Sequence, residues 1–431
     1  MKVGSEDMAI HVVKSGETLW AISNYYGVSI SSIVRDNGLL SIDSIVPGLA
    51  LYIPENRTLL YQRYYRIKAG DRLWMLARRF QTSVEQILQA NSGIDPYQLR
   101  VGQMLNIPSP VKLPLTTLGF IEPYNPEAFL SNFQQLANEL TYIAVAAFSI
   151  TEEGYAYVIL RDQEIVVRSK QLNVTPLLMI RNFRDGEFSP EIIGNIFENP
   201  IYRNHLITSL VNLVRTRGYE GVSIDFEFVP PERRNEFTIF LRDLKIALGE
   251  YLLHINVHAK SEDLPTNRIV GAYDYREIGR IADIVAVMTI DYGYPTGPPD
   301  PISPIWWVEE VLRYALTHIS PNKLQMALAL YGYDKRVPSN QTQALSVQGA
   351  QNQAIIKGSP IQYDLVSQSP WYQYWEGADQ HIVWFEDIRS YMEKYIVMDQ
   401  YQLLGTTFWQ LSLPAPQHWA FLRNNIAVQK R

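Results

Sequence analysis

From residue 118 onward, short apolar runs alternate with segments whose apolar residues recur at helical spacing. Eight runs have the length and the β-branched or aromatic content of buried strands: 118–121, 142–148, 176–180, 221–228, 252–258, 284–289, 324–330 and 405–408. Strands that alternate with helices form parallel sheets, and eight such units fit a (β/α)8 barrel. We therefore predict an α/β barrel over residues 117–431. The stretch from about residue 336 to 399 is long for one βα connection, so we expect it to hold an insertion between the seventh and eighth strands.

The first quarter of the chain contains two copies of one pattern, offset by 54 positions without a gap. The shared positions are Gly16/Gly70, Leu19/Leu73, Trp20/Trp74, Ser29/Ser83, Ile33/Ile87, Asn37/Asn91, Gly48/Gly102, Ile53/Ile107 and Pro54/Pro108. Each copy predicts a small strand–helix–helix–strand (βααβ) unit, over 10–54 and 64–108. We expect a tail at 1–9 and a proline-bearing linker at 109–116. Units this small have a limited core, so we interpret Trp20 and Trp74 as packing residues.

Composition narrows the function classes. The chain has no cysteine, which excludes disulfides, thiolate catalysis and Cys-based zinc sites. Its formal net charge of −6 gives no reason to expect a nucleic-acid partner. No apolar run approaches the roughly 20 residues of a membrane span, and residues 1–7 lack the apolar core of a secretory signal. We therefore expect no membrane span and no signal peptide in the chain, and the oligomeric state stays unknown.

The run 221–228 contains the strongest candidate chemistry. Alternation along a strand places Ser223, Asp225 and Glu227 on one face, with the two carboxylates about 6.6 Å apart along the strand. Carboxylates are rarely buried without a partner, so the choice lies between a structural ion pair and a functional site. In a barrel, the carboxyl ends of the strands face the active site, and Asp291 and Trp409 also follow strands there.

A third group of polar strand residues allows two interpretations, metal ligands or barrel-lining residues, and metal binding is the weaker of the two. His254, Asn256 and His258 share a strand face, but no third ligand follows from the pattern, so we interpret them as polar barrel-lining residues. We predict no metal and no cofactor.

The repeated units resemble LysM domains, and we name residues 10–54 LysM1 and residues 64–108 LysM2. The resemblance rests on Ser15-Gly-Glu-Thr-Leu-Trp20 with Asn37, and on Ala69-Gly-Asp-Arg-Leu-Trp74 with Asn91. It implies binding of glycans that contain N-acetylglucosamine, such as peptidoglycan and chitin, in a groove between the first strand–helix loop and the second helix–strand loop. The groove residues it implies are Gly16, Glu17, Thr18, Gly70, Asp71 and Arg72, with those just after Asn37 and Asn91. Modules that only mediate protein contacts are the alternative.

The barrel region resembles glycoside hydrolase family 18. The family motif Asp-Gly-x-Asp-x-Asp-x-Glu appears as Glu220-Gly-Val-Ser-Ile-Asp-Phe-Glu227, in which Ser223 replaces an Asp. The family's Met-x-Tyr-Asp motif appears as Met288-Thr-Ile-Asp291, so Ile290 stands where the family has Tyr. Trp409 matches the tryptophan that floors the sugar subsite.

Together with the LysM pattern, three further segments narrow the resemblance: Leu330-Tyr-Gly-Tyr333, Trp384-Phe-Glu-Asp387 and Pro416-Gln-His-Trp419. They are similar to those of sporulation-associated spore cortex-fragment-lytic N-acetylglucosaminidases. The resemblance implies a peptidoglycan hydrolase associated with the spore coat, the cortex or the cell wall of a spore-forming bacterium.

The resemblance also implies a substrate-assisted retaining mechanism. Glu227 would act as general acid and base, and Asp225 would orient the acetamido group that attacks the anomeric carbon. Asp291 would bind near the acetamido oxygen and Trp409 would stack under the sugar ring.

Four further residues are expected at the substrate. Tyr292 or Tyr331 would replace the hydroxyl lost at Ile290, and Ser223 and Glu386 would line the cleft, with a structural role as the alternative for Glu386. Two other functions stay open: a non-catalytic glycan-binding or spore-coat protein on the same fold, and a chitinase-like enzyme acting on chitooligosaccharides.

Overall fold

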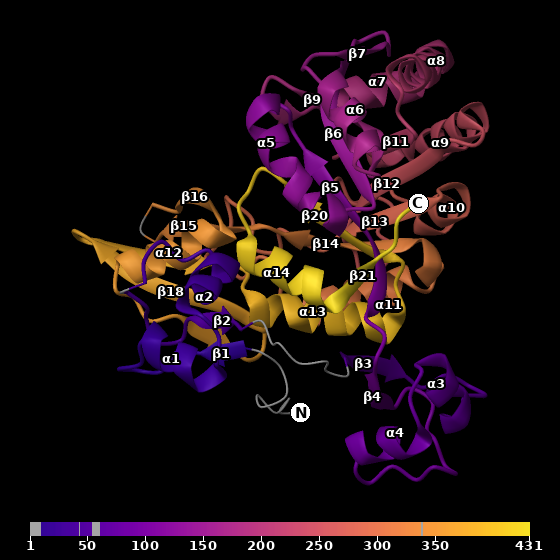
Figure 1. The fold of residues 1–431 in the computed structure, drawn as a ribbon. Helices are drawn as coiled ribbons and strands as arrows, with labels where there is room; N and C mark the ends of the chain where they lie inside the picture. Colours follow the sequence, from indigo (N-terminus) through magenta and orange to yellow (C-terminus); the bar gives the residue numbers. More distant parts are fainter. Residues whose placement is uncertain (1–9, 43, 54–60, 338) are drawn as a thin grey trace.

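The computed structural model of the chain describes residues 10–42, 44–53, 61–337 and 339–431. The predicted tail at 1–9 and Pro54 lie outside the described residues. Figure 1 shows a barrel, an insertion with LysM1 beside it, and LysM2 below the helices α11 and α13. Within the described ranges, no helix has both the length and the apolar character needed to span a bilayer.

Eight parallel strands form a closed barrel, in the order β5-β20-β14-β13-β12-β11-β8-β6, and a β5–β6 pairing completes the circle. The barrel strands are β5 (Leu113–Ile121), β6 (Tyr142–Ile150), β8 (Thr175–Arg181), β11 (Gly221–Asp225), β12 (Leu252–His258), β13 (Ile284–Met288), β14 (Leu324–Ala329) and β20 (Gly405–Trp409). Their residues are buried almost throughout, because the strands are covered on both faces. The predicted barrel is confirmed, and each of the eight predicted runs forms one of its strands.

Helices cover the outside of the barrel (Figure 1). They are α5 (Pro126–Leu136), α6 (Gln163–Gln171), α7 (Pro190–Glu198), α8 (Pro200–Arg217), α9 (Arg234–Leu248), α10 (Tyr275–Ile281), α11 (Ile305–Ala315), α13 (Ile388–Tyr401) and α14 (Pro416–Asn425). Short strands extend the sheet at its margins: β7 (Ala156–Val158) pairs with β6, and β21 (Ile426–Val428) pairs with β5. A hairpin of β9 (Phe183–Arg184) and β10 (Glu187–Phe188) follows β8.

The fourth strand, β11, is shorter than its apolar run. It ends at Asp225, whereas the alternating pattern predicts a strand through Phe228. Phe228 has φ +53°, in the left-handed region that interrupts a strand. Glu227 therefore lies in the loop after β11, two residues beyond the strand end.

A five-stranded antiparallel sheet with one helix forms the insertion between β14 and β20. Its elements are β15 (Tyr331–Arg336), β16 (Gln341–Ser346), α12 (Val347–Ile356), β17 (Gln362–Asp364), β18 (Ser369–Glu376) and β19 (Asp379–Trp384). The predicted insertion is confirmed, but it begins at Tyr331 rather than near residue 336. Helix α13, which lies at the end of the stretch expected to hold the insertion, packs against the barrel core through Tyr391, Tyr395 and Met398.

Both LysM modules have the predicted βααβ order. LysM1 consists of β1 (Ile10–Val12), α1 (Leu19–Tyr26), α2 (Ile30–Asn37) and β2 (Ala50–Tyr52). LysM2 consists of β3 (Tyr61–Arg66), α3 (Leu73–Arg79), α4 (Val84–Ala90) and β4 (Met104–Ser109). Because β4 ends at Ser109 and β5 begins at Leu113, only three residues separate LysM2 from the barrel strand.

The interpretation of Trp20 and Trp74 as packing residues is wrong. Their exposed fractions are 69% and 59%, respectively. Both follow the first residue of a helix, and the neighbouring Leu19 and Leu73 fill the two module cores instead. The apolar core of each module is therefore formed without its tryptophan.

Candidate functional site

Glu227 lies in a loop whose backbone is fixed from two neighbouring strands. Asn182, just after β8, accepts a hydrogen bond from Glu227 N–H (2.9 Å) and donates one to Glu227 C=O (2.8 Å). Its amide also donates to Ser189 C=O (3.0 Å), so all of its contacts are to backbone atoms. Asn182 is 2% exposed. A buried amide that bonds both the N–H and the C=O of one residue leaves the Glu227 side chain little freedom to shift with its backbone.

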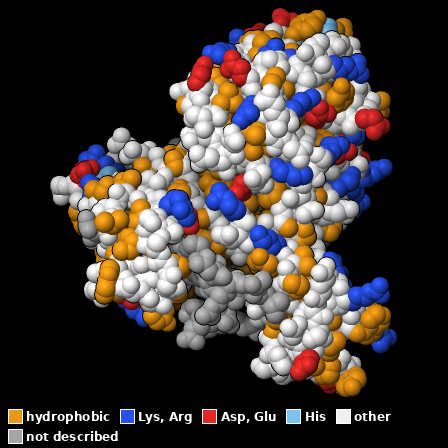
Figure 2. Space-filling view, in the orientation of Figure 1, with side chains coloured by type: hydrophobic (Ala, Val, Ile, Leu, Met, Phe, Trp, Pro, Cys, Tyr) orange, Lys and Arg blue, Asp and Glu red, His pale blue; other side chains and the backbone are white. Residues whose placement is uncertain are grey.

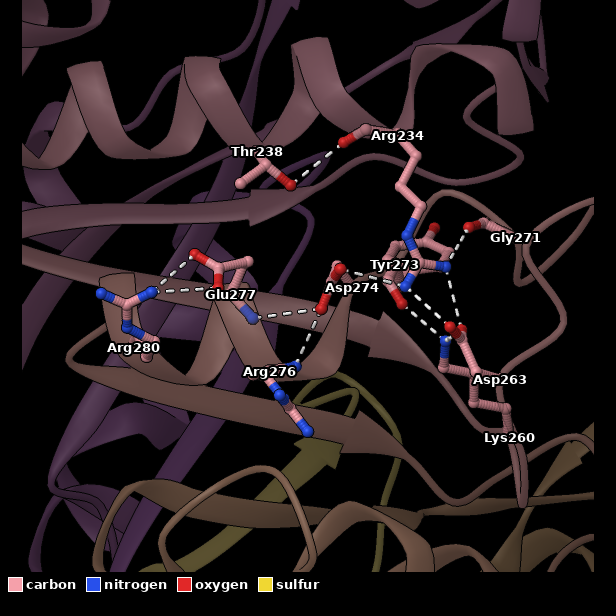
Figure 3. Close-up of polar contacts among 10 residues, drawn as sticks. All are labelled: Arg234, Thr238, Lys260, Asp263, Gly271, Tyr273, Asp274, Arg276, Glu277 and Arg280. Carbon is pink, nitrogen blue, oxygen red and sulfur yellow. Dashed lines mark hydrogen bonds and ion pairs between the residues drawn. The ribbon is translucent and has the colours of Figure 1, made fainter.

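A second contact fixes the residue before Glu227. The buried Tyr273 hydroxyl donates to Phe226 C=O (2.6 Å). Figure 3 shows what holds Tyr273: Lys260 Nζ donates to its carbonyl oxygen (2.6 Å) and to Asp263 (2.9 Å). Arg234, the first residue of α9, forms two 2.9 Å bonds to the Asp263 carboxylate and one to Gly271 C=O. This network ties the loop between β12 and α10 to the helix that follows Glu227.

His258, at the end of β12, faces the Glu227 carboxylate. Its Nε2 lies 3.3 Å from Glu227 Oε2, and the two side chains are 18% and 19% exposed. That Nε2 is buried and forms no hydrogen bond with any described residue, and the Glu227 carboxylate is the acidic group that lies within ion-pair distance of it. The pattern of His254, Asn256 and His258 on β12 thus contained a residue of the site, His258, although we interpreted all three as barrel-lining residues.

Asp225 lies beneath Glu227, at the last position of β11, and is 5% exposed. Burial raises the pKa of the Asp225 carboxyl above its ordinary value, and the charge of Glu227 raises it further. Arg181 and His258, together with a hydrogen bond from Asn256, oppose this rise. Asp225 therefore retains a proton at pH values where an ordinary aspartate has lost it, and can donate a hydrogen bond from the floor of the site.

Ser223 is fully buried below Asp225. Its hydroxyl forms a 2.9 Å hydrogen bond with His254 Nδ1 on the neighbouring strand β12. Burial lowers the pKa of His254 to about 3, so the imidazole is neutral. The position at which the family has a carboxylate is thus occupied by a neutral hydroxyl–imidazole pair inside the barrel.

Asp291 receives two phenol hydroxyls from the insertion. Tyr331 donates to its Oδ1 at 2.6 Å and Tyr333 donates to the same oxygen at 2.9 Å. Asp291 keeps a solvent-exposed edge, but the surrounding protein displaces enough water that desolvation raises the pKa of its carboxyl. The two hydroxyls act in the opposite direction, because they stabilise the charged form.

The two tyrosines proposed to replace the hydroxyl missing at position 290 lie in different places. Tyr331 contacts Asp291, whereas the ring of Tyr292 packs against Trp306 and Trp307 of α11, at centroid distances of 5.2 and 5.5 Å. Ile290 itself packs beside Tyr331 and Tyr333. The phenols that surround Asp291 therefore come from the insertion strand β15 rather than from the loop after β13.

Trp409, the last residue of β20, lies at the barrel mouth between two apolar clusters. Its ring is 5.5 Å from that of Phe120, and it also packs against the cluster around Tyr331 and Tyr333. Its side chain is half-buried, so one part of the ring remains open to solvent. The peptide bond from Trp409 to Gln410 is cis.

Glu386 lies in the interior, away from the surface of the cleft. It is 1% exposed and forms a 2.7 Å ion pair with Lys394 of α13, whose side chain is equally buried. Burial raises the pKa of the Glu386 carboxyl, and Lys394 opposes that rise. This position supports the structural alternative for Glu386 over a substrate contact.

The predicted LysM groove residues form matching turns in the two modules. Gly16 and Gly70 have φ of +84° and +88°, and a side chain at either position would meet no neighbouring atom within 4 Å. Thr18 accepts a hydrogen bond from Ala21 N–H and caps α1, whereas Arg72 caps α3 with its backbone alone.

The carboxylates of the two turns each accept a loop amide. Glu17 accepts from Lys14 N–H (2.7 Å) and Asp71 accepts from Lys68 N–H (2.6 Å).

The described residues contain no group of three or more potential metal ligands.

Sequence reasoning missed three residues of the site: Asn182, His258 and Tyr333. Asn182 follows the third strand at the end that faces the active site, which was a usable signal. Tyr333 belongs to the segment 330–333 that we noted without giving it a role. Its contact with Asp291 could not be inferred, because it depends on how the insertion folds back over the mouth.

Residues 131–413 match the family model for glycosyl hydrolases family 18, and residues 11–54 and 65–108 match the LysM domain model. The Bacillus subtilis (strain 168) protein named "Putative sporulation-specific glycosylase YdhD" is 34% identical, and the match covers 98% of this chain and all of the relative. The cortical fragment-lytic enzyme of Bacillus anthracis is 31% identical, over 98% of this chain and 99% of the relative.

A solved structure is similar along the same length. The spore cortex-lytic enzyme SleL of Bacillus cereus superposes with a TM-score of 0.84 at 30% identity, covering 98% of both chains.

Proposed function

Because the chain belongs to glycosyl hydrolases family 18 and carries two LysM domains, we propose that it is an N-acetylglucosaminidase that cleaves β-1,4 bonds in spore cortex peptidoglycan. The names of its full-length relatives, a sporulation-specific glycosylase and cortical fragment-lytic enzymes, support this substrate. The observation that carries the proposal is the Glu227 carboxylate at the barrel mouth, with its backbone bonded on both sides by Asn182 and its floor formed by Asp225.

The proposed mechanism is substrate-assisted retention, in which the acetamido carbonyl of the sugar attacks the anomeric carbon. Glu227 protonates the leaving glycosidic oxygen and then removes a proton from the incoming water. The proton that Glu227 gives to the leaving group is replaced by the one it takes from water, so the cycle needs no second proton donor. His258 Nε2 lies 3.3 Å from the Glu227 carboxylate and contacts it from the neighbouring strand. Asp225, which holds its proton more tightly than an ordinary aspartate, orients the acetamido group.

The other wall of the site is proposed to bind the acetamido oxygen. Tyr331 and Tyr333 both donate to Asp291 Oδ1, which leaves the second carboxyl oxygen for the substrate. When that oxygen carries a proton, which desolvation of Asp291 favours, it donates to the acetamido oxygen. Trp409 supplies an apolar surface under the sugar ring. Two phenols thus take over the hydroxyl contact that Ile290 lacks.

The test compares the wild type with Glu227→Gln on cortex fragments and on N-acetylglucosamine oligomers, with products identified by mass spectrometry. We expect a loss of about 10²–10⁴-fold in rate, the usual contribution of a general acid or base. Glu220→Gln is the matched control, because Glu220 precedes the same strand at its opposite end and pairs with Lys170 on the surface. It should retain the wild-type rate.

Each outcome decides among the candidate functions. Equal product formation by the wild type and Glu227→Gln would overturn the mechanism. No product from either would indicate a glycan-binding or spore-coat protein, and products from chitooligosaccharides alone would indicate a chitinase-like enzyme. Retention is checked separately by the anomeric configuration of the first-formed product in a proton NMR time course.

A further inference from the structure

The two LysM modules attach to the rest of the molecule in different ways. LysM1 contacts the insertion through the end of its second helix, the segment where the implied glycan groove has one of its walls. Asn37 C=O accepts from Gln351 (2.8 Å), and Gly38 C=O accepts from Gln348 and Asn352 (2.9 Å each). Asn352 also accepts a hydrogen bond from Leu40 N–H (3.1 Å). Side chains of helix α12 therefore bond both carbonyl oxygens and an N–H group of this LysM1 loop.

The later part of the same loop is covered as well. Ile361 N–H donates to Pro47 C=O (2.9 Å), and a side chain added at Gly48 would lie 1.7 Å from the Ile361 carbonyl oxygen. LysM1 core residues also share one apolar cluster with residues of the insertion. One wall of the LysM1 groove is therefore occupied by the protein itself.

LysM2 contacts the barrel through its first strand instead. Arg63 of β3 forms a buried ion pair with Asp399 of α13, at 2.8 and 2.9 Å, and Asp399 also accepts from Tyr64 N–H (2.7 Å). Its loop after α4 is exposed, and a side chain at Gly93 or at Gly102 would meet nothing within 4 Å. Figures 1 and 2 show LysM2 as a lobe that projects from the rest of the molecule.

Charge separates the modules further. Residues 64–108 of LysM2 include six Lys and Arg against three Asp and Glu, whereas residues 10–54 of LysM1 include two against three. Three of the LysM2 cations, Lys68, Arg72 and Arg100, are exposed on the two loops that would form the groove. At the equivalent positions LysM1 has Lys14, Thr18 and the buried Val46.

The carboxylates of the LysM2 loops are already engaged. Asp71 accepts from Lys68 N–H (2.6 Å) and Asp95 accepts from Tyr97 N–H (2.9 Å). The Tyr97 ring, 94% exposed, adds an apolar surface to the loop that carries Arg100. An exposed basic end of this kind attracts an anionic ligand.

We propose that LysM2 is the module that holds the polymer, and that it selects an N-acetylglucosamine-containing glycan bearing carboxylates over a neutral one. The lactyl groups and peptide stems of peptidoglycan supply such carboxylates, and chitin lacks them. LysM1 serves mainly as a fixed part of the catalytic body. This inference rests on the proposed function, because it assigns the glycan binding implied by the LysM fold to one of the two modules.

The test is co-sedimentation of the full chain with insoluble peptidoglycan and with chitin. The LysM2 variant Lys68→Ala/Arg72→Thr/Arg100→Val replaces two of its three cations by the residues that LysM1 has there. We expect about tenfold weaker binding to peptidoglycan, since each exposed ion pair contributes up to about 1 kcal/mol. The wild type should also lose affinity between roughly 0.05 and 0.5 M salt, and the variant should lose less.

Lys14→Ala in LysM1 is the matched control, and it should bind like the wild type. Binding to chitin should change less than twofold in both variants. Unchanged peptidoglycan binding of the LysM2 variant, an equal loss with Lys14→Ala, or an equal loss on chitin would each overturn the inference.

Failure of the proposed function is recognised separately. All variants are assayed for product release from soluble fragments, a reaction that uses Glu227 and no LysM cation. A chain that sediments as expected but releases no product contradicts the proposed function and leaves the inference on LysM2 standing.

Discussion

LysM1 and LysM2 share one sequence pattern and one βααβ fold, yet the rest of the molecule uses them differently. In both, the asparagine at the end of the second helix bonds the helix and the closing strand: Asn37 donates to Tyr52 C=O and Asn91 donates to Asn106 C=O. Only in LysM1 does that asparagine also accept a bond from the barrel, from Gln417 (2.8 Å). The repeated positions thus specify the inside of each module, and the unrepeated surface decides whether the loop after its second helix is covered by the rest of the protein.

The largest expected effect tests whether LysM1 and LysM2 are attached to the rest of the protein by separate contacts. Arg63→Met should release LysM2 from α13 at a cost of about 3–5 kcal/mol, because Asp399 would remain as a buried charge without its partner. Native-state hydrogen exchange should show earlier opening of LysM2 and unchanged protection of LysM1. Arg78→Met, an exposed site on the same module, is the control. Equal opening of both modules would mean that they do not dock independently.

A matched pair of glycines measures the LysM1 contact directly. Gly48 and Gly102 occupy equivalent positions with φ of +82° and +84°, so alanine strains both backbones by about 1 kcal/mol or more. At Gly48 the added carbon also meets the Ile361 carbonyl oxygen, which adds about 1–3 kcal/mol of overpacking. We expect Gly48→Ala to destabilise LysM1 more than Gly102→Ala destabilises LysM2, by hydrogen exchange. Equal losses of stability in the two modules would show that the contact between residue 48 and Ile361 adjusts to the added carbon without a loss of free energy.

The fold was predictable because its signals are local. Runs such as 142–148 and 284–289 are apolar on both faces, as strands covered on both faces must be, and each lies where a strand was predicted. The end of the fourth strand could not be predicted, since it depends on the positive φ of Phe228.

The position of LysM1 could not be predicted either. Its contacts are amide side chains, such as those of Gln351 and Gln417, that bond atoms more than 300 residues away. Such bonds follow no sequence period.

The candidate site likewise combines residues that local sequence signals identify with residues that only long-range folding brings into place. Glu227, Asp225 and Asp291 follow strands, and strand ends in a barrel converge, so their common location was expected. Asn182 forms two hydrogen bonds with the Glu227 backbone, and Tyr333 donates one to Asp291; both contacts are formed by the folding of loops and of the insertion. Which polar residue reaches which carboxylate is set by that folding, and the sequence contains no periodic signal for it.

The two asparagines provide a finer comparison. Asn37→Ala and Asn91→Ala each remove the same bonds inside a module, but Asn37→Ala also leaves the buried Gln417 amide without one of its acceptors. We expect LysM1 to lose about 1 kcal/mol more than LysM2. A double variant with Gln417→Ala should cancel that difference in a thermodynamic cycle. No coupling in the cycle would show that the bond contributes nothing to docking.

The smallest effect concerns the first loop, where LysM1 has a histidine and LysM2 has none. The Lys14 N–H lowers the pKa of the Glu17 carboxyl, and His11, at 2.9 Å, lowers it further. A carboxyl whose pKa is lowered by folding stabilises the loop above the ordinary glutamate pKa of about 4.3, and that stabilisation is lost as the pH falls through the lowered value. Side-chain carbon NMR should find the Glu17 midpoint below that of ordinary glutamates. His11→Ala should move the midpoint only part of the way back, because the backbone amide is the larger cause. A complete return would show that His11, and so a feature present only in LysM1, sets the charge of this loop.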